Sequence, residues 1–90
     1  MAGVTLFALY TDYNLITRNR IGTDLSGQAP LGNGADGIRI AFGPKNNIIG
    51  GTEEEGNVIA HNGQKSIALE LRPGDTNFVS GNRMFKNRLP

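Results

Sequence analysis

Three stretches of the chain share one alternation of apolar and other residues: 3–9, 37–43 and 66–72. Each places an apolar residue at every second position. Two aliphatic columns appear when they are aligned, Val4, Ile38 and Ile67 in the first, and Leu6, Ile40 and Leu69 in the second. A period of two puts both columns on one strand face. The pattern therefore predicts three equivalent strands with the same inward face.

Two shorter segments follow each of these strands. Every one begins with Asn and carries an aliphatic residue or Met two positions later. The first segments align Asn14, Asn47 and Asn77, followed by Ile16, Ile49 and Val79; the second segments align Asn19, Asn57 and Asn82, followed by Ile21, Ile59 and Met84. The chain thus repeats a unit of three short strands with Asn at the corners.

The spacing of the columns is constant to within one residue except for two insertions, within 23–36 and within 50–56. Without them, each unit is about two dozen residues long, which lies in the range of solenoid repeats. The units cover about 4–35, 36–64 and 65–90 of a single domain, 1–90. Thirteen glycines and ten asparagines supply the turns between strands.

This periodicity predicts an all-β parallel β-helix of about three coils, with three short strands in each. Coils stacked about 4.8 Å apart place like residues on like. Aliphatic columns then fill the interior, and Asn columns form hydrogen-bonded ladders. An antiparallel sandwich or meander is the alternative, and Asn33-Gly34 would suit a hairpin turn there. That alternative does not explain the repeated Asn columns.

Residues 14–62, "NLITRNRIGTDLSGQAPLGNGADGIRIAFGPKNNIIGGTEEEGNVIAHN", resemble bacterial right-handed parallel β-helix repeat proteins. The family is related to pectate-lyase-like and carbohydrate-binding β-helix proteins, so the resemblance implies a right-handed coil. Its members range from polysaccharide lyases and hydrolases to cell-surface repeats, and many are exported. The resemblance therefore implies a fold and does not select an activity.

The composition limits the classes of partner that the chain is expected to bind and bears on its cellular compartment. Ninety residues bury a modest core, and without cysteine neither a disulfide nor a thiolate metal site adds to it. A net charge of +1 gives no basic footprint for nucleic acid. The apolar residues 1–10 are too short for a membrane span and lack a signal-peptide pattern, which leaves the compartment unassigned.

Candidate chemistry is sparse. The outward face of the first strands offers Arg39 and Glu70, which suit a cross-strand ion pair better than a catalytic dyad. Tyr10 and Tyr13 flank the first corner and, with that pair, form a candidate carbohydrate-binding surface. His61 is the single histidine, so neither a catalytic triad nor a zinc site is expected. The sequence predicts no catalytic residue, metal or cofactor.

The edges of the stack are the remaining candidate. A β-helix has two edges of unpaired backbone groups, which solenoids usually cover. We therefore expect a non-enzymatic structural or interaction module that forms homo-oligomers, by end-to-end stacking across a two-fold axis or by strand exchange. A polysaccharide-binding or polysaccharide-active remnant is the alternative.

Overall fold

The computed structural model describes residues 2–8, 10–26, 30–70 and 76–89. These residues form nine strands, and no helix occurs among them. The strands are β1 (Val4–Phe7), β2 (Leu15–Ile16), β3 (Arg20–Ile21), β4 (Ile38–Ala41), β5 (Ile48–Gly50), β6 (Val58–Ala60), β7 (Ile67–Glu70), β8 (Phe78–Ser80) and β9 (Arg83–Phe85).

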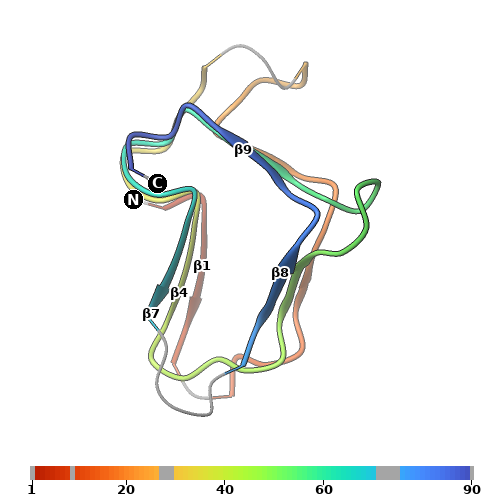
Figure 1. Ribbon diagram of the computed structural model, residues 1–90. Helices are drawn as coiled ribbons and strands as arrows, with labels where there is room; N and C mark the ends of the chain where they lie inside the picture. Colours follow the sequence, from red (N-terminus) through yellow and green to blue (C-terminus); the bar gives the residue numbers. More distant parts are fainter. Residues whose placement is uncertain (1, 9, 27–29, 71–75, 90) are drawn as a thin grey trace.

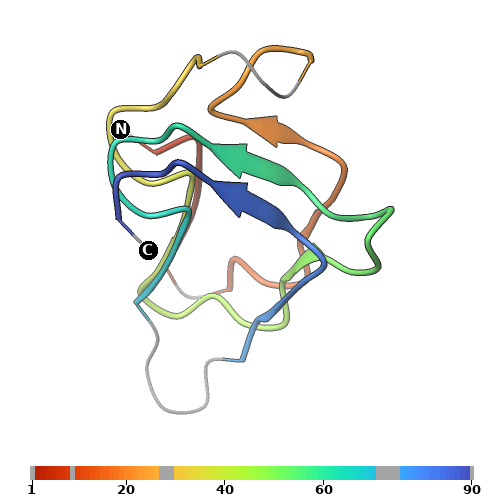
Figure 2. The same ribbon diagram turned by 45° about the horizontal axis from the view of Figure 1, so that its top comes forward.

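The strands make three parallel sheets of three, ordered β1-β4-β7, β2-β5-β8 and β3-β6-β9. Figure 1 looks along the stack from the third coil, and the chain turns counter-clockwise as it approaches the viewer, which is right-handed. Figure 2 shows β3, β6 and β9 lying one above another as orange, green and blue arrows. The predicted three-coil parallel β-helix is confirmed.

The register between coils matches the aligned columns. Val4 pairs with Ile38 and Ile38 with Ile67, and the Ile16 and Ile21 columns pair in the same way. The second coil supplies the centre of the core: Ile38, Ile40, Ile49 and Ile59 are fully buried. Apolar residues recur at every second position because only alternate side chains point into the coil.

The corners share a local conformation. The residue before a corner Asn often has a positive φ, as in Tyr13 (61°), Arg18 (55°), His61 (59°) and Lys86 (51°). This left-handed conformation bends the chain sharply at one residue and is costly for a side chain with a Cβ. The fold holds it because the following Asn is hydrogen-bonded between coils.

Both insertions leave the outline of the coil. The longer one follows β3 and begins with an antiparallel bridge between Thr23 and Pro30. The shorter one follows β5, and Thr52 N–H donates to the Glu55 carboxylate there. Figure 1 shows the described parts of both loops outside the three-sided cross-section, so neither part interrupts the stacked sheets.

Candidate functional site

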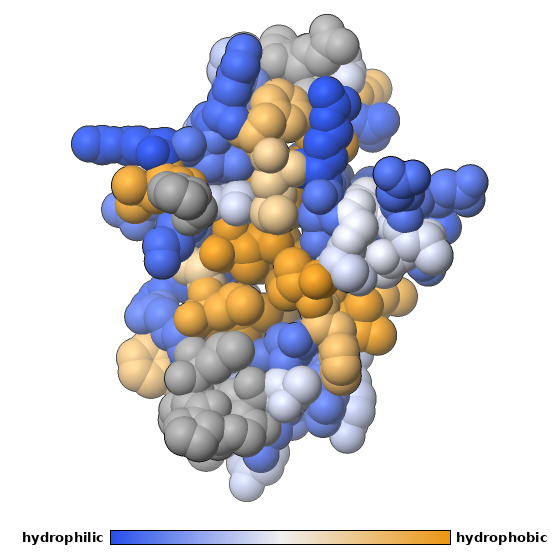
Figure 3. All heavy atoms as spheres, in the orientation of Figure 1, coloured by the Kyte–Doolittle hydropathy of each residue, from blue (hydrophilic) through white to orange (hydrophobic). Residues whose placement is uncertain are grey.

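The outer edge of β7, β8 and β9 is an apolar surface, which we call the third-coil end. It comprises the inward-column side chains Ile67, Leu69, Val79 and Met84. Leu69, Val79 and Met84 are 42%, 36% and 47% exposed, although their columns are buried in the second coil. Figure 3 shows the apolar side chains gathered at the centre of this face and polar side chains around them.

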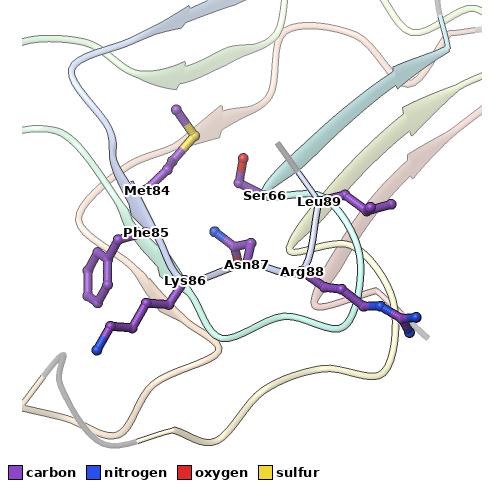
Figure 4. Close-up of a pocket in the computed structure, with 7 residues that line it drawn as sticks. All are labelled: Ser66, Met84, Phe85, Lys86, Asn87, Arg88 and Leu89. Carbon is purple, nitrogen blue, oxygen red and sulfur yellow. The ribbon is translucent and has the colours of Figure 1, made fainter.

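A hollow of about 530 Å³ lies beside this apolar centre. Its lining residues are Ser66, Met84, Phe85, Lys86, Asn87, Arg88 and Leu89. In Figure 4, Asn87 lies between Lys86 and Arg88, and the side chains of Phe85, Lys86 and Arg88 point outward. No acid or histidine is among the described residues that line it.

The opposite face, which we call the first-coil end, is the outer edge of β1, β2 and β3. Its inward side chains Leu6, Ile16 and Ile21 are only 9%, 8% and 7% exposed. Its corner residues Asn14 and Asn19 are exposed. The two ends of the same solenoid therefore differ: one presents apolar side chains, and the other presents mainly strand edges and polar corners.

The corner asparagines form ladders along the stack. The backbone N–H and Nδ2 of Asn14 donate to Oδ1 of Asn47 over 2.7 and 3.0 Å. Asn47 donates in the same way to Oδ1 of Asn77 over 3.0 and 2.9 Å. The second predicted column, Asn19, Asn57 and Asn82, repeats this pattern over 2.9–3.2 Å. Both ladders are present in the structure as the sequence predicts.

A third ladder joins Asn33, Asn62 and Asn87, again through the backbone N–H and Nδ2 of one coil and Oδ1 of the next. The sequence alignment missed this column because the first insertion moves Asn33 away from the position that matches Asn62. The signal was nevertheless present, since Asn62 and Asn87 stand at the same distance from Asn57 and Asn82.

The central-coil asparagines are buried and fully hydrogen-bonded. Asn47, Asn57 and Asn62 are 0%, 1% and 2% exposed. Each also donates through Nδ2 to a backbone carbonyl; Asn57, for example, reaches the Ile16 oxygen over 2.9 Å. Buried amides that make all these bonds fix the register between coils, because a shift would leave them unpaired.

Arg39 and Glu70 meet on the outward face of the first sheet, where Arg39 Nε donates to Glu70 Oε2 over 2.5 Å. This hydrogen bond raises the pKa of Arg39, which keeps the guanidinium charged. Both side chains are more than a third exposed, so solvent screens the pair. They line a hollow of about 310 Å³ together with Asp36, Gln64, Lys65, Ala68 and Leu89.

Tyr10 and Tyr13 lie in the turn between β1 and β2 and are 89% and 79% exposed. Neither is among the described residues that line the hollow beside Arg39 and Glu70. The four candidate carbohydrate-binding residues thus divide into two groups, an ion pair on the first sheet and two rings at a corner. Phe7 and Phe42, whose ring centroids are 5.0 Å apart, form a ring contact between the first and second coils.

His61 is a corner residue. Its ring meets Phe85 edge-on at 5.7 Å, and its Nε2 is buried without a partner among the described residues. Over the same residues, no group of three or more His, Asp or Glu side chains is placed to hold a metal ion. Nor does any described segment form a helix of a length and hydropathy that would cross a bilayer.

No protein-family model, no curated protein and no solved structure matches the chain. The geometry of the described residues distinguishes one surface above the others, the third-coil end, where the interior columns of the solenoid meet solvent.

Proposed function

We propose that this chain is a structural or interaction module, without enzymatic activity, that associates with itself through its coil ends. Its relation to the bacterial right-handed β-helix repeat proteins is part of the same proposal and has the quoted motifs of residues 14–62 as its support. In this proposal, the interior columns of one chain are covered by another chain, as the columns of the second coil are covered by its neighbours.

One observation carries the proposal, the exposure of the inward column at the third-coil end. Ile49 of the second coil is fully buried, whereas Val79, its partner one coil later, is 36% exposed. Exposed apolar patches framed by polar residues mark association surfaces. The strand edges beside this patch offer unpaired backbone groups, which also favour pairing with another chain.

Sedimentation velocity of the chain over a range of micromolar concentrations tests this proposal. We expect the average mass to rise above that of the 9.6-kDa monomer as the concentration increases. A mass that stays at the monomer value throughout this range would refute self-association.

Carbohydrate binding is the second candidate, because Tyr10 and Tyr13 present almost fully exposed rings at one corner. Amphipathic rings at a surface suit stacking on sugar faces. A glycan array is the direct test, with a double Tyr10→Ala, Tyr13→Ala variant as the control. Reproducible binding that this variant loses would support the candidate, and no binding to any glycan would oppose it.

A further inference from the structure

The Asn ladders have a direction. In all three, the backbone N–H and Nδ2 of an earlier coil donate to Oδ1 of the next coil. The backbone N–H fixes this direction, because it can only face an oxygen, so a reversed carboxamide would place donor against donor. The two ends of each ladder are therefore chemically different.

At the third-coil end the ladders finish in donors. Asn77, Asn82 and Asn87 each use Oδ1 and one Nδ2 proton toward the second coil. Their backbone N–H groups and their second Nδ2 protons have no acceptor among the described residues. These groups lie at the rim of the exposed apolar columns, so a chain that covers those columns also meets these donors.

At the first-coil end the ladders finish in acceptors. Asn14, Asn19 and Asn33 each direct Nδ2 toward the second coil. The Oδ1 atoms therefore lie on the branch of the carboxamide that is turned away from the second coil. No described residue donates to them. The first-coil end thus carries, at the same three corners, the oxygens that a fourth coil would need to supply.

We infer that the third-coil end binds the first-coil end of a second copy of this chain, so that copies stack head to tail and the Asn ladders continue across the contact. This inference rests on the proposed self-association and specifies its geometry. Asn77, Asn82 and Asn87 of one copy donate to Asn14, Asn19 and Asn33 of the next. Strand pairing remains parallel, with β7 beside β1 of the second copy.

The competing two-fold arrangement places one third-coil end on another. It covers apolar side chains on both copies but brings ladder donors against ladder donors, which leaves buried N–H groups unpaired. Head-to-tail stacking covers the apolar columns of one copy and pairs the donors of that copy. The first-coil end contributes mainly strand edges and corner oxygens, because Leu6, Ile16 and Ile21 are already nearly buried.

The two arrangements also differ in how the assembly grows. A two-fold contact closes on itself as a dimer, whereas a head-to-tail contact leaves one free end of each kind and continues. We therefore expect the sedimenting mass to increase past twice the monomer mass without a plateau. A plateau at a dimer would overturn the head-to-tail geometry and leave self-association intact.

Disulfide trapping tests the geometry directly, because the chain has no cysteine of its own. Continuing the register of Thr5 on Arg39 and Arg39 on Ala68 places Ala68 beside Thr5 of the next copy. Both side chains are on the outward column, so Thr5→Cys and Ala68→Cys leave the core unchanged. Cα atoms of neighbouring strands lie within disulfide range.

The two single variants, one carrying a mass tag, are mixed under mild oxidation. We expect the Thr5→Cys with Ala68→Cys heterodimer to exceed either homodimer at least about tenfold, because only that pair is held at high effective concentration. Leu25→Cys, on the 85% exposed side chain of a loop, is the control partner and should trap neither variant.

Each remaining outcome has a definite meaning. A homodimer of Ala68→Cys as the main product, or equal trapping in all mixtures, would overturn head-to-tail stacking. Absence of trapping together with a monomeric sedimentation mass would overturn self-association itself. Absence of trapping with a rising mass would overturn only the inferred geometry. Circular dichroism of both variants first establishes that they retain the fold.

Discussion

The second and third coils are built alike, but only the second has a described coil on both sides. Ile40, Ile49 and Ile59 of the second coil are fully buried, whereas Leu69, Val79 and Met84 of the third are 36–47% exposed. The residues at these paired positions are all apolar. The third-coil side chains are therefore exposed because no described coil covers their outer side. The first coil also has a described coil on one side only, yet Leu6, Ile16 and Ile21 are 7–9% exposed, so the two outer coils of the solenoid are not equivalent.

The largest expected effect comes from a buried ladder residue of the second coil. Asn57→Ala removes the acceptor of two Asn19 donors and one donor to the buried Ile16 carbonyl. Because each unpaired group costs about 1–3 kcal/mol, we expect unfolding to become easier by on the order of 3–5 kcal/mol. Urea denaturation at a dilute, monomeric concentration measures it.

The matched control is Asn19→Ala, in the same column of an outer coil. This substitution removes the hydrogen bond from Asn19 Nδ2 to Asn57 Oδ1. The bond from the backbone N–H of residue 19 to the same Oδ1 remains. A loss of about 1 kcal/mol is expected there. Equal losses for the two variants would show that central and outer ladder positions do not differ as the exposures indicate.

A pair of core truncations compares the same column in the two coils. Ile49→Ala creates a cavity in a fully buried position and should cost about 2–4 kcal/mol. Val79→Ala, one coil later, removes a side chain that already meets solvent, so we expect about 1 kcal/mol or less. The same denaturation measurement applies, and a larger loss at Val79 would contradict the account of burial by stacking.

A charge at the third-coil end should break self-association. Met84→Lys places an ammonium group among the exposed columns. In the monomer this charge is solvated, but a second chain that covers the columns would bury it. Burying an unpaired charge costs several kcal/mol, so we expect the association constant to fall about a hundredfold. Ile48→Lys, on an outward side chain that is 41% exposed, is the control. Sedimentation mass should fall for the first variant only.

Much of the fold was predictable because its signal is repeated. The columns of Val4, Ile16 and Ile21 each recur twice, and the structure pairs all three as aligned. The ladders through Asn47 and Asn57 followed from the same repetition. A single strand of two residues, such as β2, has no periodicity of its own and became recognisable only through its counterparts in the other coils.

The site was less predictable, since it depends on which atoms of a repeated residue are used. The sequence shows that Asn recurs, but it does not show that Oδ1 always faces the earlier coil. The insertion within 23–36 also prevents the Asn33 ladder from being recognised in the sequence. Nor does an alternating pattern distinguish Leu6, which is 9% exposed, from Leu69, which is 42% exposed, because the difference arises from packing outside each strand.

The corner conformation allows a small stabilisation in the third coil. Lys86 has a φ of 51°, and glycine adopts this region without the Cβ penalty, so Lys86→Gly should stabilise the fold by about 1 kcal/mol. His61 has the same conformation in the second coil but packs against Phe85. His61→Gly should therefore gain less. Thermal unfolding compares the two, and a greater gain at His61 would contradict this assignment.

The smallest expected effect concerns the loop by which the second coil differs from the third. The hydrogen bond from the Thr52 backbone N–H lowers the pKa of Glu55, with a further contribution from Arg18. Because the pKa of Glu55 is lower in the folded chain than in the unfolded chain, its ionised carboxylate stabilises the loop at pH values above the unfolded pKa. This stabilisation is lost as the pH falls through the folded pKa. In an NMR titration, the amide chemical shift of Thr52 should therefore change at a pH below the ordinary pKa of a Glu side chain, about 4.3.

Glu55→Gln separates this carboxylate from the rest of the loop. The variant keeps a side-chain oxygen that accepts from Thr52, but that side chain cannot titrate, so the part of the amide shift change that Glu55 causes should disappear. The corner residues Asn57 and Asn82 should not respond in either protein, because the loop lies outside the stacked coils. A change in the Thr52 amide shift at a pH equal to or above the ordinary Glu pKa would contradict the stabilising contact. A change in the Asn57 amide shift over the same range would show that the loop is coupled to the ladder.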